Sequence, residues 1–125
     1  MIIYDIFLDN IKIGTSMFER ADAPMGVVSG NIKFIGKPLT FDTISKYCKD
    51  NNIVVDEHPA NKFISTQTIP ALMARNEKGS EIKGIGCYLT GMDGEDYEIT
   101  IIGIPYPFYE EQFPDHVKKY REQFK

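Results

Sequence analysis

The stretch 99–116 constrains the fold more than any other part of the chain. It reads Ile-Thr-Ile-Ile-Gly-Ile-Pro-Tyr-Pro-Phe-Tyr-Glu-Glu-Gln-Phe-Pro-Asp-His. The apolar, β-branched run at its start predicts a strand, and the three prolines and four aromatic residues that follow predict a turn. Pro114 suits the first position of a helix, because the N–H that it lacks would be unpaired there. The chain is therefore expected to pass from a strand through an extended, proline-rich aromatic turn into a C-terminal helix.

The segment 114–124 has the pattern of an amphipathic helix. Asp115 favours the positive end of the helix dipole, and basic residues gather toward the negative end, namely Lys118, Lys119, Arg121 and Lys125. Aromatic and apolar residues recur at helical spacing and predict a buried stripe, consisting of Phe113, Val117, Tyr120 and Phe124.

A second helix is predicted over residues 41–50. Pro38 precedes it, Thr40 is a suitable N-cap, and Asn51-Asn52 can adopt the left-handed geometry that ends a helix. Its apolar stripe is formed by Phe41, Ile44, Tyr47 and Cys48.

Alternating patterns predict two β-hairpins. Residues 2–8 and 11–14 flank the turn signal Asp9-Asn10, and residues 82–90 and 97–104 flank a turn at 91–94. Further extended segments are expected at 27–28, 31–35, 53–55 and 63–68. Together these elements predict an α+β fold, with a curved, mainly antiparallel sheet of about six to seven strands and two helices, 41–50 and 114–124.

Composition limits the class of protein. A chain of 125 residues with 42% hydrophobic residues is expected to form a single globular domain, 1–125, rather than a disordered segment. Its net charge of −4 argues against nucleic-acid binding and favours a basic protein as partner. The apolar start is interrupted by Asp5 and has no basic n-region, so we expect neither a signal peptide nor a membrane contact. A cytoplasmic location follows, and the Lys, Asn and Ile usage is compatible with a bacterial source.

Few residues carry chemistry in a recognisable pattern. Cys48 and Cys87 have no CxxC partner and are predicted to be free buried thiols, although a disulfide between them stays open. The run Asp56-Glu57-His58 has no second ligand cluster, which favours a solvated acidic loop over a metal site. Gly84-Ile-Gly86 lacks the remaining residues of a phosphate loop, and its glycines are expected to allow curvature or close packing. We therefore expect no metal and no cofactor.

The two histidines, His58 and His116, are the remaining candidates for acid–base catalysis. A pair of histidines could remove and donate a proton in turn, but no spacing rule brings these two together. His116, next to Asp115 at a helix start, is more simply read as a surface residue. No catalytic residue is predicted, although the sequence does not decide whether the protein is an enzyme.

The aromatic and acidic turn supplies the candidate partner-binding residues, which are Tyr106, Phe108, Tyr109, Glu110 and Glu111. Exposed aromatic side chains would anchor a partner and the carboxylates would pair with its basic groups. The alternative is that the aromatics fasten the last helix to the sheet. If side chains alternate along this segment, Tyr106 and Tyr109 are expected to point outward, whereas Phe108 and Phe113 are expected to point into the core. The loop 19–26 is a second candidate surface, with a tight structural loop as its alternative.

Three functional hypotheses remain open. The first is a non-enzymatic binding protein, in its concrete form an immunity or inhibitor protein that neutralises a basic toxin or nuclease. The second is a small enzyme or ligand-binding domain with a pocket in the curved sheet, and the third is an oligomerising module, such as a homodimer.

Overall fold

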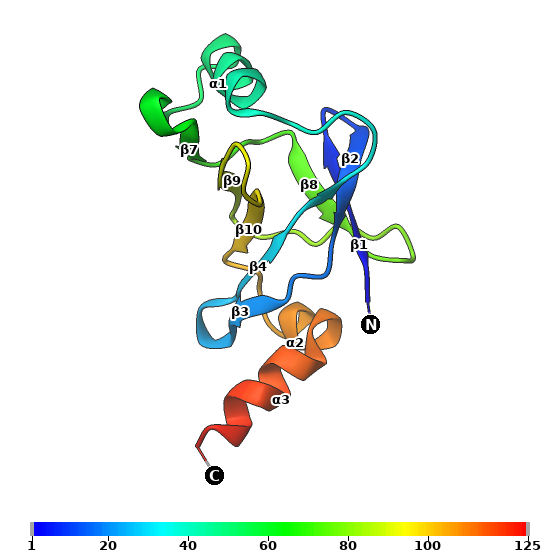
Figure 1. Ribbon diagram of the computed structural model, residues 1–125. Helices are drawn as coiled ribbons and strands as arrows, with labels where there is room; N and C mark the ends of the chain where they lie inside the picture. Colours follow the sequence, from blue (N-terminus) through cyan, green and yellow to red (C-terminus); the bar gives the residue numbers. More distant parts are fainter. Residues whose placement is uncertain (1, 125) are drawn as a thin grey trace.

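The computed structural model describes residues 2–124 (Figure 1). The four-stranded sheet has the order β5-β2-β1-β8, and the six-stranded sheet has the order β3-β4-β10-β9-β7-β6. The first contains β5 (Lys33–Phe34), β2 (Ile11–Ser16), β1 (Tyr4–Leu8) and β8 (Leu72–Arg75). The second contains β3 (Arg20–Asp22), β4 (Val27–Asn31), β10 (Glu98–Ile102), β9 (Gly86–Met92), β7 (Phe63–Thr66) and β6 (Val55–His58). The helices are α1 (Phe41–Asp50), α2 (Phe108–Gln112) and α3 (Pro114–Glu122).

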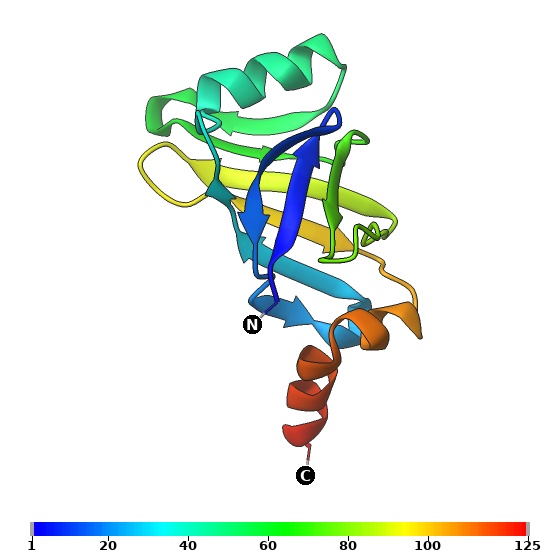
Figure 2. The same cartoon turned by 90° about the vertical axis from the view of Figure 1, so that its right-hand side faces the viewer.

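The predicted α+β class is confirmed, with curved antiparallel sheets and helices at both predicted places. The predicted antiparallel sheet of about six to seven strands corresponds to the six-stranded sheet, and the structure adds a second sheet of four strands that faces it (Figure 2). The sequence pattern missed two strands: β3 falls in the segment 19–26, for which a loop was the simpler prediction, and β8 covers residues for which no extended segment was predicted. The prediction of a solvated loop at Asp56-Glu57-His58 is also wrong, because these residues belong to β6 and pair with β7.

The first hairpin forms as predicted, between β1 and β2. Asp9 and Asn10 have φ angles of 51° and 66°, the left-handed values that a two-residue hairpin turn of type I′ requires. Asn and Asp tolerate this backbone better than other side chains, so the turn follows directly from the sequence.

The second hairpin also forms, with different bounds. β9 begins at Gly86 rather than at Ile82, and Gly91 lies inside the strand. The preceding residues are irregular, and Gly84 packs so closely on the carbonyl of Ile102 that a Cβ would not fit, in agreement with the expectation of close packing at its glycines. The Ile82 N–H instead donates to Ala74 of the other sheet, at 2.9 Å.

The helix α1 occupies residues 41–50 as predicted. Thr40 caps it reciprocally: its Oγ1 accepts from the Thr43 N–H at 3.3 Å, and its own N–H donates to Thr43 Oγ1 at 2.8 Å. Phe41, Ile44 and Cys48 are buried along one face. A stripe at helical spacing therefore does pack against the core.

The C-terminal helix α3 begins at Pro114 as predicted but ends at Glu122. The predicted buried stripe is wrong in its second half, because Tyr120 is 38% exposed and Phe124 is 72% exposed. The helix projects beyond the sheets, so its last turns have little to pack against (Figures 1 and 2). Lys125, counted above among the basic residues of this helix, lies outside the described residues.

The extended reading of the proline-rich turn is wrong from Phe108 onward, where the short helix α2 begins. Proline restricts the residue before it and is compatible with a helix start, so Pro107 does not prevent a helix from following. The Tyr109 N–H donates to Pro105 O at 2.8 Å and the Phe113 N–H donates to Tyr109 O at 2.8 Å.

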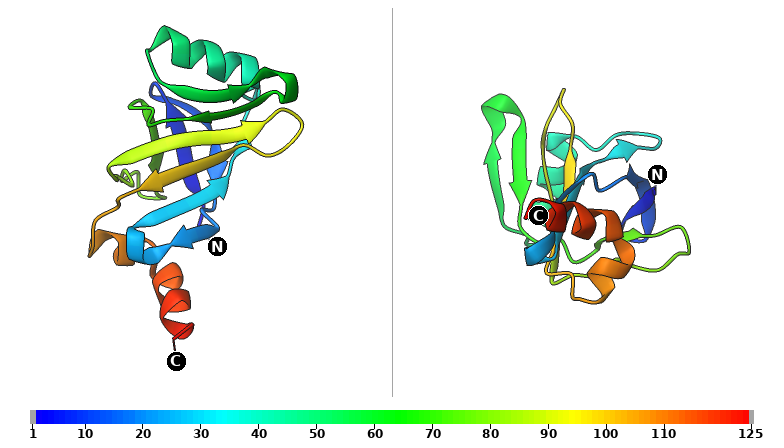
Figure 3. Two further views of the ribbon diagram at one scale, coloured as in Figure 1. Left: turned by 90° about the vertical axis from the view of Figure 1, so that its left-hand side faces the viewer. Right: turned by 90° about the horizontal axis from the view of Figure 1, so that it is seen from below.

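The core lies between the two sheets and is closed by helices at both ends. α1 covers the end near β6 and β7, whereas α2 and α3 cover the end near β3 and β4 (Figures 2 and 3). The second end is filled by buried aromatic rings that contact one another, with centroids 5.2–6.1 Å apart for the pairs Tyr4–Phe18, Tyr4–Phe113, Tyr109–Phe113 and Phe18–Phe113. Such packing fixes the C-terminal helices on the sheets.

Candidate functional site

The candidate site is one face of the six-stranded sheet. Alternate residues of its strands, such as Val28, Leu89 and Ile99, point into the core and are almost completely buried. The intervening residues point the other way, and we call that side the outer face. It consists of Arg20, Asp22, Val27, Ser29, Asn31, Asp56, His58, Phe63, Ser65, Tyr88, Thr90, Met92, Glu98, Thr100 and Ile102. In the left view of Figure 3, no helix or strand of residues 2–124 lies over it.

A row of polar side chains crosses this face from strand to strand. The strand registers align Asn31, Glu98, Thr90, Ser65 and Asp56, which belong to β4, β10, β9, β7 and β6. Ser65 Oγ and Thr90 Oγ1 share a hydrogen bond of 3.1 Å. The row therefore presents hydroxyl, amide and carboxylate groups in one line over five strands.

Arg20 organises one end of this row from the edge strand β3. Its guanidinium donates to Asn31 Oδ1 at 2.7 Å and to Glu98 Oε2 at 2.5 Å, and it lies 3.7 Å from Glu19. The Asn31 side chain in turn donates to Asp96 at 3.0 Å. The cation is thus fully engaged with groups of the chain itself, and carboxylates surround it.

The other end of the outer face is more apolar. Phe63 lies opposite Met92 on β9 and opposite His58 on β6. The His58 ring lies 5.7 Å from the Phe63 ring, and its Nε2 is 3.4 Å from Asp56 Oδ1. Tyr88, half-buried like Phe63, adds another aromatic ring opposite Thr100 on β10. Aromatic residues and Met are enriched at the centres of protein-binding surfaces, which have a polar rim.

The outer face is acidic. Its strand positions carry the carboxylates of Asp22, Asp56 and Glu98 but a single guanidinium and no lysine. The β9–β10 turn at one end of the sheet adds Asp93, Glu95 and Asp96. A concentration of one sign of charge attracts partners of the opposite sign and repels others.

The sequence-predicted segment 106–111 is largely engaged in the fold. Tyr109, expected to point outward, is 0% exposed, and its hydroxyl donates to Val27 O at 2.9 Å. It points inward because it lies on the face of α2 that packs on the core, where its ring contacts the ring of Phe113. Phe108 is half-buried, and the Glu110 carboxylate pairs with Arg121 at 3.0 Å. The alternative, in which aromatic residues fasten the last helix to the sheet, describes Phe108 and Tyr109, while Glu110 pairs within the C-terminal helices.

Two members of that segment remain available at the surface. Glu111 is exposed, and Tyr106 is 47% exposed while its hydroxyl donates to Ala23 O at 2.7 Å. Burial in the fold raises the pKa of the Tyr106 and Tyr109 phenols above the ordinary value. Their hydroxyls therefore act as hydrogen-bond donors that hold the turn against β4 and the residues after β3.

The two histidines do not meet. His58 lies on β6, at one edge of the six-stranded sheet, whereas His116 lies on α3 beyond the opposite edge. His116 Nε2 is 2.6 Å from Phe18 O, and since a carbonyl can only accept, this nitrogen carries the proton. Phe18 has the positive φ angle of 44° that a bulky residue rarely adopts, so His116 helps to hold a strained turn.

The remaining chemical candidates stand apart from one another. Among residues 2–124, no three His, Cys, Asp or Glu side chains converge to hold a metal ion. Glu57 turns away from its neighbours Asp56 and His58 and accepts a hydrogen bond from Ser45 at 2.7 Å. Cys48 and Cys87 are free thiols, and burial raises the pKa of Cys87 to about 12. A thiol with so high a pKa is a poor nucleophile.

The outer face could not be assembled from the sequence. Period-two alternation does place Ser29 and Asn31, Tyr88 and Thr90, and Glu98 and Thr100 on the polar sides of their strands. The strand order that lines them up comes only from the fold.

The comparisons with known proteins give no relative: no family model, no curated protein and no solved structure matches the chain. Within residues 2–124, no helix is both long enough and apolar enough to cross a membrane.

Proposed function

We propose that this protein is a non-enzymatic binding domain that docks a basic protein on the outer face of its six-stranded sheet. One observation carries the proposal: the face is uncovered, and it combines Tyr88, Phe63 and Met92 with a polar row that has carboxylates and no lysine. Soluble folds cover a sheet on one face and leave the other to solvent, but that second face is ordinarily mixed in charge.

The chemistry of this face favours a protein over other partners. Phosphate groups of a nucleic acid would meet carboxylates here and would be repelled. A partner rich in Lys and Arg would find the Asp56 carboxylate close to the rings of His58 and Phe63, and aromatic anchors supply much of the affinity of protein interfaces.

The concrete form of the proposal is an inhibitor of immunity type, which covers the active site of a basic toxin or nuclease. Such a role needs a rigid acidic surface and no catalytic machinery. The free thiols of Cys48 and Cys87 fit a reducing compartment, so the proposal places the protein in the cytoplasm.

The experiment is a capture of partners from the source cells, followed by calorimetry with the purified partner. The outer-face variant is Tyr88→Ala/Asp56→Lys. Its matched control, Phe124→Ala/Glu77→Lys, makes the same kind of aromatic truncation and charge reversal at exposed positions elsewhere. We expect a basic partner whose affinity falls about tenfold or more in the outer-face variant alone.

A third variant separates the two candidate surfaces. Tyr106→Ala/Glu111→Lys removes the two surface-available members of the segment 106–111 without touching the outer face. Loss of the partner in this variant, with the outer-face variant unaffected, would assign binding to that segment. Failure to capture any partner would contradict the proposal as a whole.

A further inference from the structure

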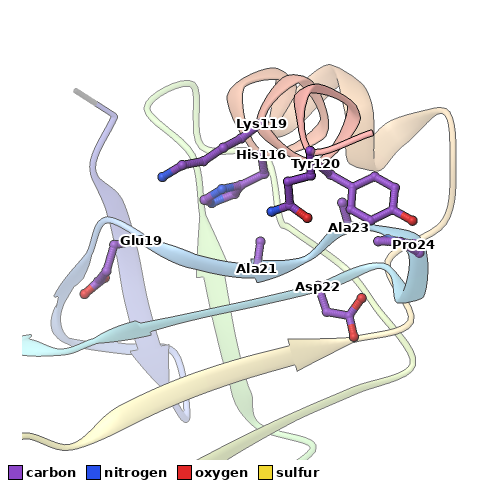
Figure 4. A pocket seen from close by; sticks show the side chains of 9 residues that line it. Glu19, Ala21, Asp22, Ala23, Pro24, His116, Lys119 and Tyr120 are labelled. Atoms are coloured by element: carbon purple, nitrogen blue, oxygen red, sulfur yellow. The ribbon is translucent and has the colours of Figure 1, made fainter. Parts of the chain in front are cut away.

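A groove lies between the edge strand β3 and the helix α3 (Figure 4). Its volume is about 500 Å³. One wall is formed by Glu19, Ala21 and Asp22 of the β3 region and by the start of the following 3₁₀ turn η1 (Ala23–Met25), and the other by a single face of α3. The Glu19 carboxylate already accepts from the Asn31 N–H and lies 3.7 Å from Arg20, and in Figure 4 the Asp22 carboxylate points away from α3. The helix wall consists of His116, Lys119, Tyr120 and Gln123, spaced as neighbours on one side of a helix.

The strand wall is an open sheet edge. β3 ends the six-stranded sheet and pairs only with β4, and all three of its residues are exposed. Within the described chain, the backbone groups of residues 20–22 form no hydrogen bond outside the β3–β4 ladder. Such an edge presents unpaired N–H and C=O groups to any extended chain that reaches it. Ala21, whose side chain is a single methyl group, leaves the space between this edge and α3 open.

The helix wall supplies a cation beside that edge. In Figure 4, Lys119 and His116 reach from α3 over the strand at the level of Ala21. The Lys119 ammonium forms no ion pair with any residue between 2 and 124, whereas Arg121 on the same helix is paired with Glu110. The His116 Nε2–H is already used on Phe18 O, which leaves Lys119 as the available charged donor.

We propose that this groove binds an extended peptide, which adds a strand to the free edge of β3 and places a carboxylate on Lys119. Main-chain hydrogen bonds give affinity in this mode of recognition, and the charged group at the end of the strand sets the direction of the peptide. The site lies at the free edge of β3 and shares only Asp22 with the outer face, and it stands whether or not a basic protein docks there.

The projection of α3 past the edge favours a peptide over a second copy of the chain. A dimer through two β3 edges would bring two projecting helices to the same interface (Figures 2 and 3). A single extended segment needs only the width of one strand, about 5 Å.

The test is a nuclear magnetic resonance titration with peptides of about five residues, randomised at each position and ending in a free carboxylate. The backbone amide signals of Arg20, Ala21 and Asp22 are followed, and the same pool with an amidated C-terminus is the second probe. We expect these amides to shift and to exchange more slowly with solvent in the presence of the carboxylate pool.

Two lysine variants make the result specific. Lys119→Ala should weaken binding of the carboxylate pool about tenfold and remove the difference from the amidated pool, because it removes a charge-assisted hydrogen bond. Lys118→Ala, one position away and outside the groove, should bind as the unmodified protein does. Absence of any response at residues 20–22 overturns the proposal, as does a Lys118→Ala effect equal to that of Lys119→Ala. A dimer detected by light scattering with β3 amides protected in the free protein would also overturn it, since a second copy would then occupy the edge.

Discussion

The guanidinium of Arg20 and the carboxylate of Glu98 form an ion pair 2.5 Å long between residues that are 78 positions apart. Arg20 lies on the edge strand β3 and Glu98 on β10, so the side chains meet over β4, which lies between them. This pair neutralises the single cation of the outer face and leaves the remaining carboxylates in excess.

Replacing Arg20 by glutamine is expected to change stability little. Both partners are well exposed, and exposed ion pairs contribute about 0–1 kcal/mol to the free energy of unfolding. Urea denaturation of Arg20→Gln should therefore fall within about 1 kcal/mol of the unmodified protein. A much larger loss would mean that the pair holds β3 on the sheet rather than setting the charge of its surface.

Asp93 is expected to matter more to stability than its exposure indicates. Its Oδ1 accepts the Phe41 N–H at 2.8 Å, at the start of α1, and the Tyr97 hydroxyl at 2.8 Å. Asp93→Ala should lower the free energy of unfolding by about 1–3 kcal/mol, because it removes two hydrogen bonds to a charged acceptor. Glu95→Ala, in the same turn, is the control and should change stability by less than about 0.5 kcal/mol. An equal loss of stability for Asp93→Ala and Glu95→Ala in thermal denaturation would contradict the stabilising role of the two hydrogen bonds to Asp93.

The hydroxyl of Tyr109 should contribute more to the free energy of unfolding than the hydroxyl of Tyr106. Tyr109→Phe leaves the ring in the core but removes a part-buried hydrogen bond from a completely buried side chain to Val27 O, which should cost about 1 kcal/mol. Tyr106→Phe removes a bond to Ala23 O at a half-exposed ring, where water can replace it. Chemical denaturation measures the free energy of unfolding of the two variants. A larger loss of stability for Tyr106→Phe than for Tyr109→Phe would contradict the placement of Tyr109 inside the core and of Tyr106 at the surface.

Local signals in the sequence predicted the local structure well. The Asp9-Asn10 turn, the Thr40 cap and the start of α3 at Pro114 each depend on residues close to one another, and the structure confirms all three. The same local reasoning failed where packing over long distances decides. Tyr120 and Phe124 have the right spacing for burial, but α3 runs past the end of the core.

The candidate site could not be predicted from the sequence either, because it too depends on contacts between distant parts of the chain. Aromatic and acidic residues in 106–111 stand out in the sequence because they are adjacent, yet Tyr109 is buried and Glu110 is paired with Arg121. The polar row from Asn31 to Asp56 draws one residue from each of five strands. Only the strand order and register bring those residues into line.

Alkaline pH should unfold the protein. Burial raises the pKa of Tyr4 from 10.0 to about 12, and it raises the pKa of Tyr97 and Tyr109 in the same direction. Between pH 10 and 12 the unfolded phenols lose protons that the folded ones keep, so the unfolded state binds fewer protons and stability falls as pH rises. Below the unfolded pKa these groups make no pH-dependent contribution.

The check is a series of urea denaturations through this pH range. Tyr4→Phe should flatten the decline, because one of the groups responsible is removed, while Tyr88→Phe on the outer face serves as the control. A decline of the same steepness in Tyr4→Phe would contradict the role of this buried phenol.

The most direct measurement is methyl cross-saturation in the complex with the captured partner, which reports the methyl groups that touch it. The proposal predicts that methyl signals of the outer face lose intensity, namely those of Val27, Thr90 and Met92. Ile11 and Ile35, exposed on the side of the four-stranded sheet, should keep theirs. Intensity loss at Ile11 and Ile35 with the outer-face methyls unchanged would contradict the assignment of the outer face as the docking surface.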